Sequence, residues 1–157
     1  MKYHTGGQLF LTLRSPIFYA TKKLLIANGF EVVAEKIVPD QTEEITATII
    51  DWTDNIKIDL VLTTGGTGVS PADVTPEATR SLLDREIPGI GEAMRLASLA
   101  KTKNAILSRG IAGIRNKSLI INLPGSEKAA RENIEAVLEA IPHAIYKIKG
   151  GMDDCGS

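Results

Sequence analysis

The sequence predicts a three-layer α/β/α fold on a mostly parallel sheet, with one strand late in the chain running antiparallel. Two observations support this prediction. β-rich apolar segments alternate with amphipathic helical segments along the chain, a pattern typical of strand–helix–strand units. A tight turn at Arg115-Asn116-Lys117 lies between two late β-rich segments and leaves no room for a crossover helix, so one strand there is antiparallel.

The first half of the chain is expected to contain three strands and two helices. Pro16 suits the first turn of a helix, and Gly29 suits the position just after its end. Ile45, Ile49 and Trp52 share one face of a second helix. In chain order we expect a strand at 8–13, a helix at 16–28, a strand at 31–38, a helix at 41–55 and a strand at 58–64.

The second half is expected to be richer in helix. Thr75 is predicted to cap a helix whose first position is Pro76, and Pro142 is a point at which the last helix can bend. We expect helices at 76–86, 89–101 and 127–149, with strands at 105–109 and 118–123. Residues 1–150 would form a single domain, followed by a polar tail at 151–157.

Composition excludes several classes of protein. The 157 residues carry 18 Lys and Arg against 19 Asp and Glu, so the basic excess of a phosphate-neutralising nucleic-acid binder is absent. Cys155 is the single cysteine, which rules out an intramolecular disulfide. No apolar run approaches the roughly twenty residues of a membrane span, and the N-terminus does not resemble a signal peptide. We therefore expect a cytoplasmic protein without a membrane or nucleic-acid partner.

A glycine-rich loop follows the strand at 58–64. The sequence Gly65-Gly66-Thr67-Gly68 permits positive φ angles and close approach of backbone N–H groups to a ligand, and a helix N-terminus follows. The spacing matches neither a Walker A loop nor a dinucleotide-binding fingerprint. Taken alone, the loop is either a sterically tight turn or a site for an anion such as phosphate.

Asp73 lies between this loop and the helix that follows. A carboxylate beside an anion site is electrostatically costly unless it holds a metal ion or a proton, and Mg²⁺ shared with a phosphate resolves the conflict. The alternative is a turn aspartate that bonds to its own backbone.

The glycine loop, followed by Asp73-Val74-Thr75-Pro76-Glu77-Ala78-Thr79, resembles the signature of the molybdopterin adenylyltransferase family of the MogA/MoaB type, which includes the G domain of gephyrin. The resemblance extends over about residues 29–150, because further motifs follow in the order of the family. They are Val38-Pro39-Asp40, Arg85-Glu86-Ile87-Pro88-Gly89, Leu107-Ser108-Arg109, Ala112-Gly113-Ile114-Arg115 and Ile120-Ile121-Asn122-Leu123-Pro124-Gly125-Ser126.

This resemblance implies ATP-dependent adenylylation of molybdopterin with release of pyrophosphate, small-molecule substrates and a homotrimer. Gly65, Gly66, Thr67 and Gly68 would cradle phosphates. Asp73 and Asp40 would act as the catalytic carboxylates that hold Mg²⁺ and pyrophosphate.

Other candidate residues each have a structural alternative. Asp40 with Glu43 also fits a helix N-cap and its capping-box partner. Ser108 is placed near the substrates by the resemblance, and Arg109 is chemically suited to clamp a phosphate, whereas the alternative for both is a solvated strand end. Pro124, Gly125 and Ser126 open the last helix, where Ser126 either caps the helix or contributes to a second phosphate site.

The N-terminus departs from the family pattern. The family has a long loop with acidic residues after its first strand, but here Arg14-Ser15-Pro16 follows that strand directly and no Asp or Glu precedes Glu31. An alternative alignment places Thr5-Gly6-Gly7 on that loop and leaves no first strand. The departure supports a second hypothesis, a non-catalytic molybdopterin-binding or scaffold module of the same fold.

Overall fold

The computed structural model describes residues 8–12 and 19–152. The shortened loop at 14–16, the segment 5–7 and Cys155 lie outside the described residues. Strands are β1 (Gln8–Thr12), β2 (Glu31–Lys36), β3 (Leu60–Thr64), β4 (Arg85–Glu86), β5 (Ala112–Arg115) and β6 (Ser118–Leu123). Helices are α1 (Tyr19–Ala27), α2 (Thr42–Ile50), α3 (Thr75–Arg80), α4 (Pro88–Leu99), α5 (Glu127–Val137) and α6 (Ala140–Ile148), with the π-turn η2 (Asp51–Asn55) and the 3-10 turn η3 (Lys103–Leu107).

The strands form a six-stranded sheet in the order β2-β1-β3-β6-β5-β4. The pairs β2–β1, β1–β3 and β3–β6 are parallel, whereas β5 is antiparallel to both β6 and β4. The predicted α/β fold with one late antiparallel strand is therefore confirmed. β1 lies inside the sheet between β2 and β3, which confirms a strand at the N-terminus and removes the alignment that lacked one.

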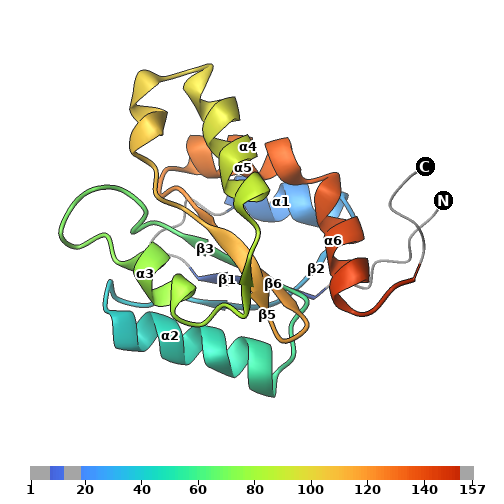
Figure 1. Cartoon of the computed structure of the whole chain (residues 1–157). Helices are drawn as coiled ribbons and strands as arrows, with labels where there is room; N and C mark the ends of the chain where they lie inside the picture. The colour runs from blue at the N-terminus through green and yellow to red at the C-terminus, as the bar shows by residue number, and fades with distance from the viewer. Residues whose placement is uncertain (1–7, 13–18, 153–157) are drawn as a thin grey trace.

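Helices cover both faces of the sheet, as Figure 1 shows. One face carries α2 and α3, whose Ile49 and Ala78 pack on Val61 and Ile120 of the central strands. The other face carries α1, α4, α5 and α6, which bury a larger cluster over the opposite sides of β3 and β6. β3 and β6 are fully apolar on both faces over most of their length, as expected for strands covered on two sides.

The prediction of a strand at 105–109 is wrong. Residues 103–107 form η3, where the Thr102 hydroxyl accepts a hydrogen bond from the Asn104 N–H, and Ile106 is exposed. The place beside β6 is taken by Ala112–Arg115, because the two-residue turn at 116–117 joins these residues directly to β6. Sequence reasoning found the turn but placed the first strand too early.

Three helix boundaries also differ from the predictions. α3 ends at Arg80, and Arg85–Glu86 pairs with β5 as a short edge strand. Thr75 is the first residue of α3 rather than its cap. The predicted helix at 127–149 breaks after Val137 rather than at Pro142, which lies in the first turn of α6, where proline is tolerated.

Candidate functional site

The candidate site lies where the parallel strands end. Because β2, β1, β3 and β6 run in the same direction, the loops that follow them meet at one edge of the sheet, the usual ligand position in open α/β folds. Two of these loops touch. The Gly65 N–H donates to the Leu123 carbonyl (3.1 Å), and a Cβ on Gly125 would stand 3.2 Å from the Gly65 Cα.

The glycine loop has a shape that other residues adopt poorly. Gly65 and Gly66 have φ angles of 85° and 65°, in the left-handed region. A side chain on Gly66 would also overlap the Thr75 hydroxyl, while the Thr75 N–H donates to the Gly66 carbonyl (3.1 Å). The loop is thus packed tightly against the start of α3.

The N–H groups of this loop are available to a ligand. Among the described residues, none accepts a hydrogen bond from the N–H of Gly66, Thr67 or Gly68. Successive unpaired N–H groups form a concave binding site for an anion. This geometry is compatible with the anion-binding interpretation of the loop, because these donors are not used by the described part of the chain.

Asp73 has the turn role that was considered from the sequence, and it also lies beside the glycine loop. Its Oδ2 accepts a hydrogen bond from the Ser70 N–H (2.9 Å), and its own N–H donates to the Ser70 carbonyl (2.9 Å), so it closes a local turn. The same Oδ2 lies 2.9 Å from the place where a Cβ on Gly68 would stand. The carboxylate therefore borders the glycine loop.

Asp40 does not cap α2. The N-cap position belongs to Gln41, which makes no side-chain cap hydrogen bond, so the predicted N-cap at Asp40 with its capping box to Glu43 is wrong. The Asp40 Oδ1 lies 3.6 Å from the place of a Cβ on Gly66. Asp40 and Asp73 thus lie next to two different glycines of the same loop.

Arg109 holds the glycine loop by hydrogen bonds to its carbonyl groups. Its Nε donates to the Gly68 carbonyl (2.7 Å), its Nη2 donates to the Asp73 carbonyl (2.6 Å), and its Nη1 pairs with the Glu77 carboxylate. The Arg109 N–H also donates to the Thr67 carbonyl (2.8 Å). Hydrogen bonding from Arg109 lowers the pKa of Glu77. These contacts give Arg109 three protein partners, and its contact with a phosphate stays a prediction.

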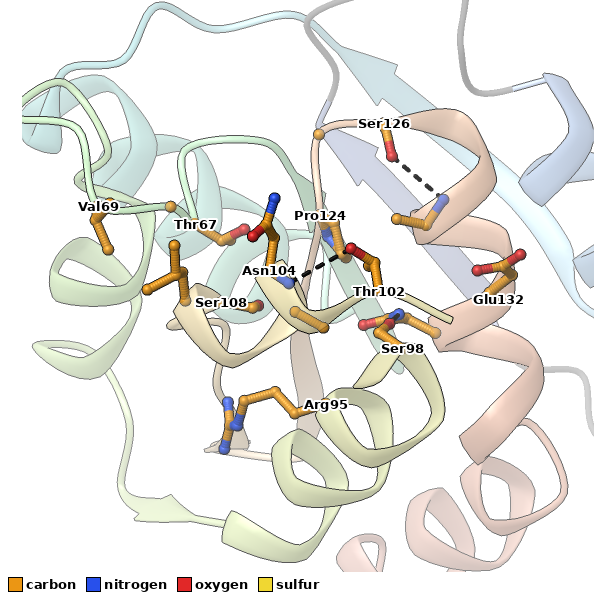
Figure 2. Close-up of a pocket in the computed structure, with 16 residues that line it drawn as sticks. Thr67, Val69, Arg95, Ser98, Thr102, Asn104, Ser108, Pro124, Ser126 and Glu132 are labelled. Carbon is orange, nitrogen blue, oxygen red and sulfur yellow. Dashed lines mark hydrogen bonds between the residues drawn. The ribbon is translucent and has the colours of Figure 1, made fainter. Parts of the chain in front are cut away.

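A cavity of about 430 Å³ opens beside the glycine loop. Figure 2 shows Thr67 and Val69 on one side, Pro124 and Ser126 behind, and η3 with the segments next to it in front. Of the predicted site residues, Thr67, Gly68, Ser108, Pro124, Gly125 and Ser126 line this cavity. Gly65, Gly66, Asp40, Asp73 and Arg109 lie outside its lining.

The start of α5 forms a second possible anion position. The Ser126 Oγ accepts a hydrogen bond from the Ala129 N–H (3.3 Å), which confirms Ser126 as the N-cap. Because the cavity also reaches Ser126, the helix N-terminus and the glycine loop border the same space.

Sequence reasoning missed the polar residues that α4 and α5 contribute to the cavity. Arg95 donates from Nη1 to the Gly110 carbonyl (2.9 Å), Asn133 donates to the Ser98 hydroxyl, and Glu132 pairs with Lys101 (2.9 Å). Asn133 interrupts the buried apolar face of α5, and a buried polar residue at such a position was the available signal.

Asn122 fixes the base of the site. It is buried in β6, and its side-chain NH₂ donates to the hydroxyls of Thr63 on β3 and Thr79 on α3, both at 2.9 Å. The Ile111 N–H donates to the Asn122 Oδ1 (3.3 Å). This amide therefore ties the two central strands to α3 and to the segment before β5.

The donor set fits a magnesium ion shared with substrate phosphates. Mg²⁺ in such sites is held by one or two carboxylates together with phosphate oxygens and water, and Asp40 and Asp73 border the glycine loop. Within residues 8–12 and 19–152, no three His, Cys, Asp or Glu side chains gather as a protein-only metal cage.

Fold and site together define a class of protein: an α/β domain with a glycine loop and a cavity at the carboxyl edge of its parallel strands. Residues 18–143 match the family described as "probable molybdopterin binding domain". The chain belongs to this family.

The chain spans only part of the length of the curated relatives it matches, with shares of 16% and 65% for two of those described here. The chain is 51% identical over 125 residues to a molybdopterin adenylyltransferase of Helicobacter pylori, covering 80% of this chain and 70% of that protein. A second such enzyme of Helicobacter pylori is 51% identical over 115 residues, which cover 73% of this chain and 65% of the relative. Gephyrin of Dictyostelium discoideum is 56% identical over 114 residues, which are 73% of this chain but 16% of that protein.

Solved structures agree with the fold. The molybdopterin biosynthesis enzyme MoaB of Thermus thermophilus superposes with a TM-score of 0.86 at 46% identity, covering 93% of this chain and 98% of the other. The Mog protein of Mycobacterium ulcerans superposes with a TM-score of 0.82 at 32% identity, covering 91% of this chain and 98% of the other.

Among the described helices, none combines the length and the apolar character that a membrane span requires.

Proposed function

We propose that this chain catalyses the transfer of AMP from ATP to molybdopterin, yielding adenylyl-molybdopterin and pyrophosphate. The observation that supports this proposal best is the glycine loop, whose unpaired N–H groups lie beside both a carboxylate and a cavity. The high identity to molybdopterin adenylyltransferases over most of the chain supports it independently.

In the proposed reaction, the terminal phosphate of molybdopterin attacks the α-phosphorus of ATP. A new P–O bond forms, the bond between the α-phosphorus and the bridging oxygen breaks, and pyrophosphate leaves. The N–H groups of Gly66–Gly68 would hold phosphate oxygens, and the N-terminus of α5 at Ser126 would receive the second anionic group. Ser108 would donate to a substrate from the opposite wall.

Asp73 and Asp40 are the proposed holders of Mg²⁺. A magnesium ion bound there would neutralise charge on the leaving pyrophosphate. Each carboxylate borders a different glycine of the loop. The two would therefore also repel a phosphate that is shifted along the loop from its proper position. Such chemistry depends on positioning and charge neutralisation rather than on a covalent nucleophile.

The alternative is a molybdopterin-binding or scaffold module that transfers no AMP. The short connection at 14–16 and the lack of acidic residues before Glu31 favour it, because the acidic first loop of the family is missing. Incubation with ATP, Mg²⁺ and molybdopterin distinguishes the two functions. Pyrophosphate release in step with adenylyl-molybdopterin would support the enzyme, and molybdopterin binding without pyrophosphate release would support the module.

We further propose that the chain is cytoplasmic and forms a homotrimer. Leu96 and Leu99 on α4, with Ile106 and Leu107 on η3, are exposed apolar residues, and contact with further copies would cover them. Sedimentation at micromolar concentration should give a mass near three chains, and a monomer under these conditions would contradict the trimer.

A further inference from the structure

We propose that Arg109 is a positioning residue that presets the glycine loop for phosphate, and that Glu77 in turn holds Arg109 in place. This inference rests on the proposed function only in the choice of phosphate ligand. It assigns Arg109 a role different from direct contact with a substrate. It also gives Glu77, which does not line the cavity, a part in the site.

The contacts of Arg109 explain why a guanidinium is needed. Its planar fork reaches the Gly68 carbonyl, the Asp73 carbonyl and the Glu77 carboxylate at once, so one side chain joins the two ends of segment 68–73 to α3. Lysine has one point charge and cannot make this set of bonds.

The direction of these bonds matters for the loop. Arg109 occupies the carbonyl oxygens of Thr67, through its backbone N–H, and of Gly68, through its side chain. The N–H groups of Gly66, Thr67 and Gly68 have no acceptor among the described residues. In a trans peptide the N–H points away from the carbonyl of the preceding residue, so fixing the Thr67 carbonyl fixes the direction of the Gly68 N–H, and fixing the Gly68 carbonyl fixes that of the Val69 N–H. Successive N–H groups fixed in this way can form a concave site for an anion.

Glu77 completes the arrangement from α3. Its carboxylate pairs with Nη1 and also accepts from Nη2 of Arg109 (3.5 Å), and it is half-exposed, with a side-chain accessibility of 51%. An exposed ion pair contributes little to stability by itself. Its two contacts with the Arg109 guanidinium instead orient the fork that bonds to the loop.

The test uses Arg109→Lys and Glu77→Gln in the full chain. The matched controls are Arg131→Lys and Glu135→Gln, which alter an exposed Arg–Glu pair on α5 (2.8 Å) away from the loop. Amide hydrogen exchange is measured without ligand across segment 65–75, and inorganic pyrophosphate binding is measured by calorimetry. Neither readout requires AMP transfer, so failure of the proposed enzyme activity would not be mistaken for failure of this inference.

We expect exchange in segment 65–75 to rise about tenfold in Arg109→Lys and several-fold in Glu77→Gln, with pyrophosphate affinity falling in the same order. Both controls should match the wild type. If the wild type transfers AMP, kcat should fall by roughly 10²-fold in Arg109→Lys, as expected for a misplaced reacting group. If Arg109→Lys fails to fold, the exchange and binding measurements on Glu77→Gln test the inference alone. Glu77 is exposed, so this variant is expected to fold.

Two results would overturn the inference. Unchanged exchange with weakened pyrophosphate binding in Arg109→Lys would mean that Arg109 contacts the phosphate directly. Unchanged exchange and unchanged binding in both variants would mean that the loop keeps its shape without this side chain.

Discussion

The loop after β3 and the loop after β6 lie side by side and each leads into a helix, yet they are held in different ways. The first depends on residues distant in sequence, because Arg109 bonds to Gly68 and Asp73 across about forty positions. The second is held by a local cap, in which Ser126 accepts from Ala129 three residues later. The comparison teaches that two neighbouring loops of one candidate site can be held by long-range and by local contacts.

The largest difference between the loops should appear in activity. Asp73→Asn should lower AMP transfer by about 10²–10³-fold, because the loop after β3 would lose the carboxylate proposed to hold Mg²⁺. Folding should persist, since the asparagine oxygen still accepts from the Ser70 N–H. Glu127→Gln, in the first turn after the other loop, is the matched control and should retain the wild-type rate. Unchanged turnover in Asp73→Asn would remove Asp73 from the mechanism.

Replacing one glycine in each loop by alanine should reduce the free energy of unfolding by different amounts. Gly66→Ala should reduce the free energy of unfolding by about 1–3 kcal/mol, because a positive φ angle and the Thr75 hydroxyl both oppose a Cβ. Gly125→Ala should cost less, since its φ is not positive and one close backbone contact, at 3.2 Å, is involved.

Urea denaturation measures both changes. Gly89→Ala, at a position with nothing within 4 Å of the new Cβ, controls for the substitution itself. Equal losses at Gly66 and Gly125 would show that the left-handed backbone contributes nothing to the difference.

Removal of the local cap should have a smaller effect. Ser126→Ala should cost about 1 kcal/mol of stability, the usual loss for an N-cap hydroxyl. Ser126→Asn keeps a side-chain acceptor and should remain near the wild type. Thermal unfolding of the three proteins checks this. A full loss in Ser126→Asn would mean that the serine acts through something other than the cap.

The smallest expected effect is a pH dependence confined to the loop after β3. Arg109 lowers the pKa of Glu77 below its usual value, so the stabilisation from this pair is present near neutral pH and is lost as pH falls through the folded-state pKa. The difference in unfolding free energy between wild type and Glu77→Gln should therefore shrink in acid. The difference between wild type and Ser126→Ala should not, because the cap does not titrate. If the Ser126→Ala difference in unfolding free energy shrank in acid as much as the Glu77→Gln difference, the pH dependence could not be assigned to the Arg109–Glu77 pair.

Much of the fold was predictable because its signals are local. β3 and β6 contain apolar runs, and the glycines at 29 and 65–68 and the proline at 76 mark boundaries that short-range sterics impose. The segment 105–109 was mispredicted because apolar residues there resemble a strand, while the actual partner of β6 is decided by the two-residue turn at 116–117.

The candidate site divides in the same way. The glycine loop, Asp73 and the Ser126 cap follow from residue type and spacing, since positive φ and capping are local properties. Tertiary structure alone decided that Asp40 borders Gly66 rather than capping α2. It also decided that Arg109 bonds to the Gly68 and Asp73 carbonyls and pairs with Glu77, and that Asn133 and Arg95 reach the cavity. These contacts join residues far apart in the chain, and only packing of the helices on the sheet brings them within hydrogen-bonding distance.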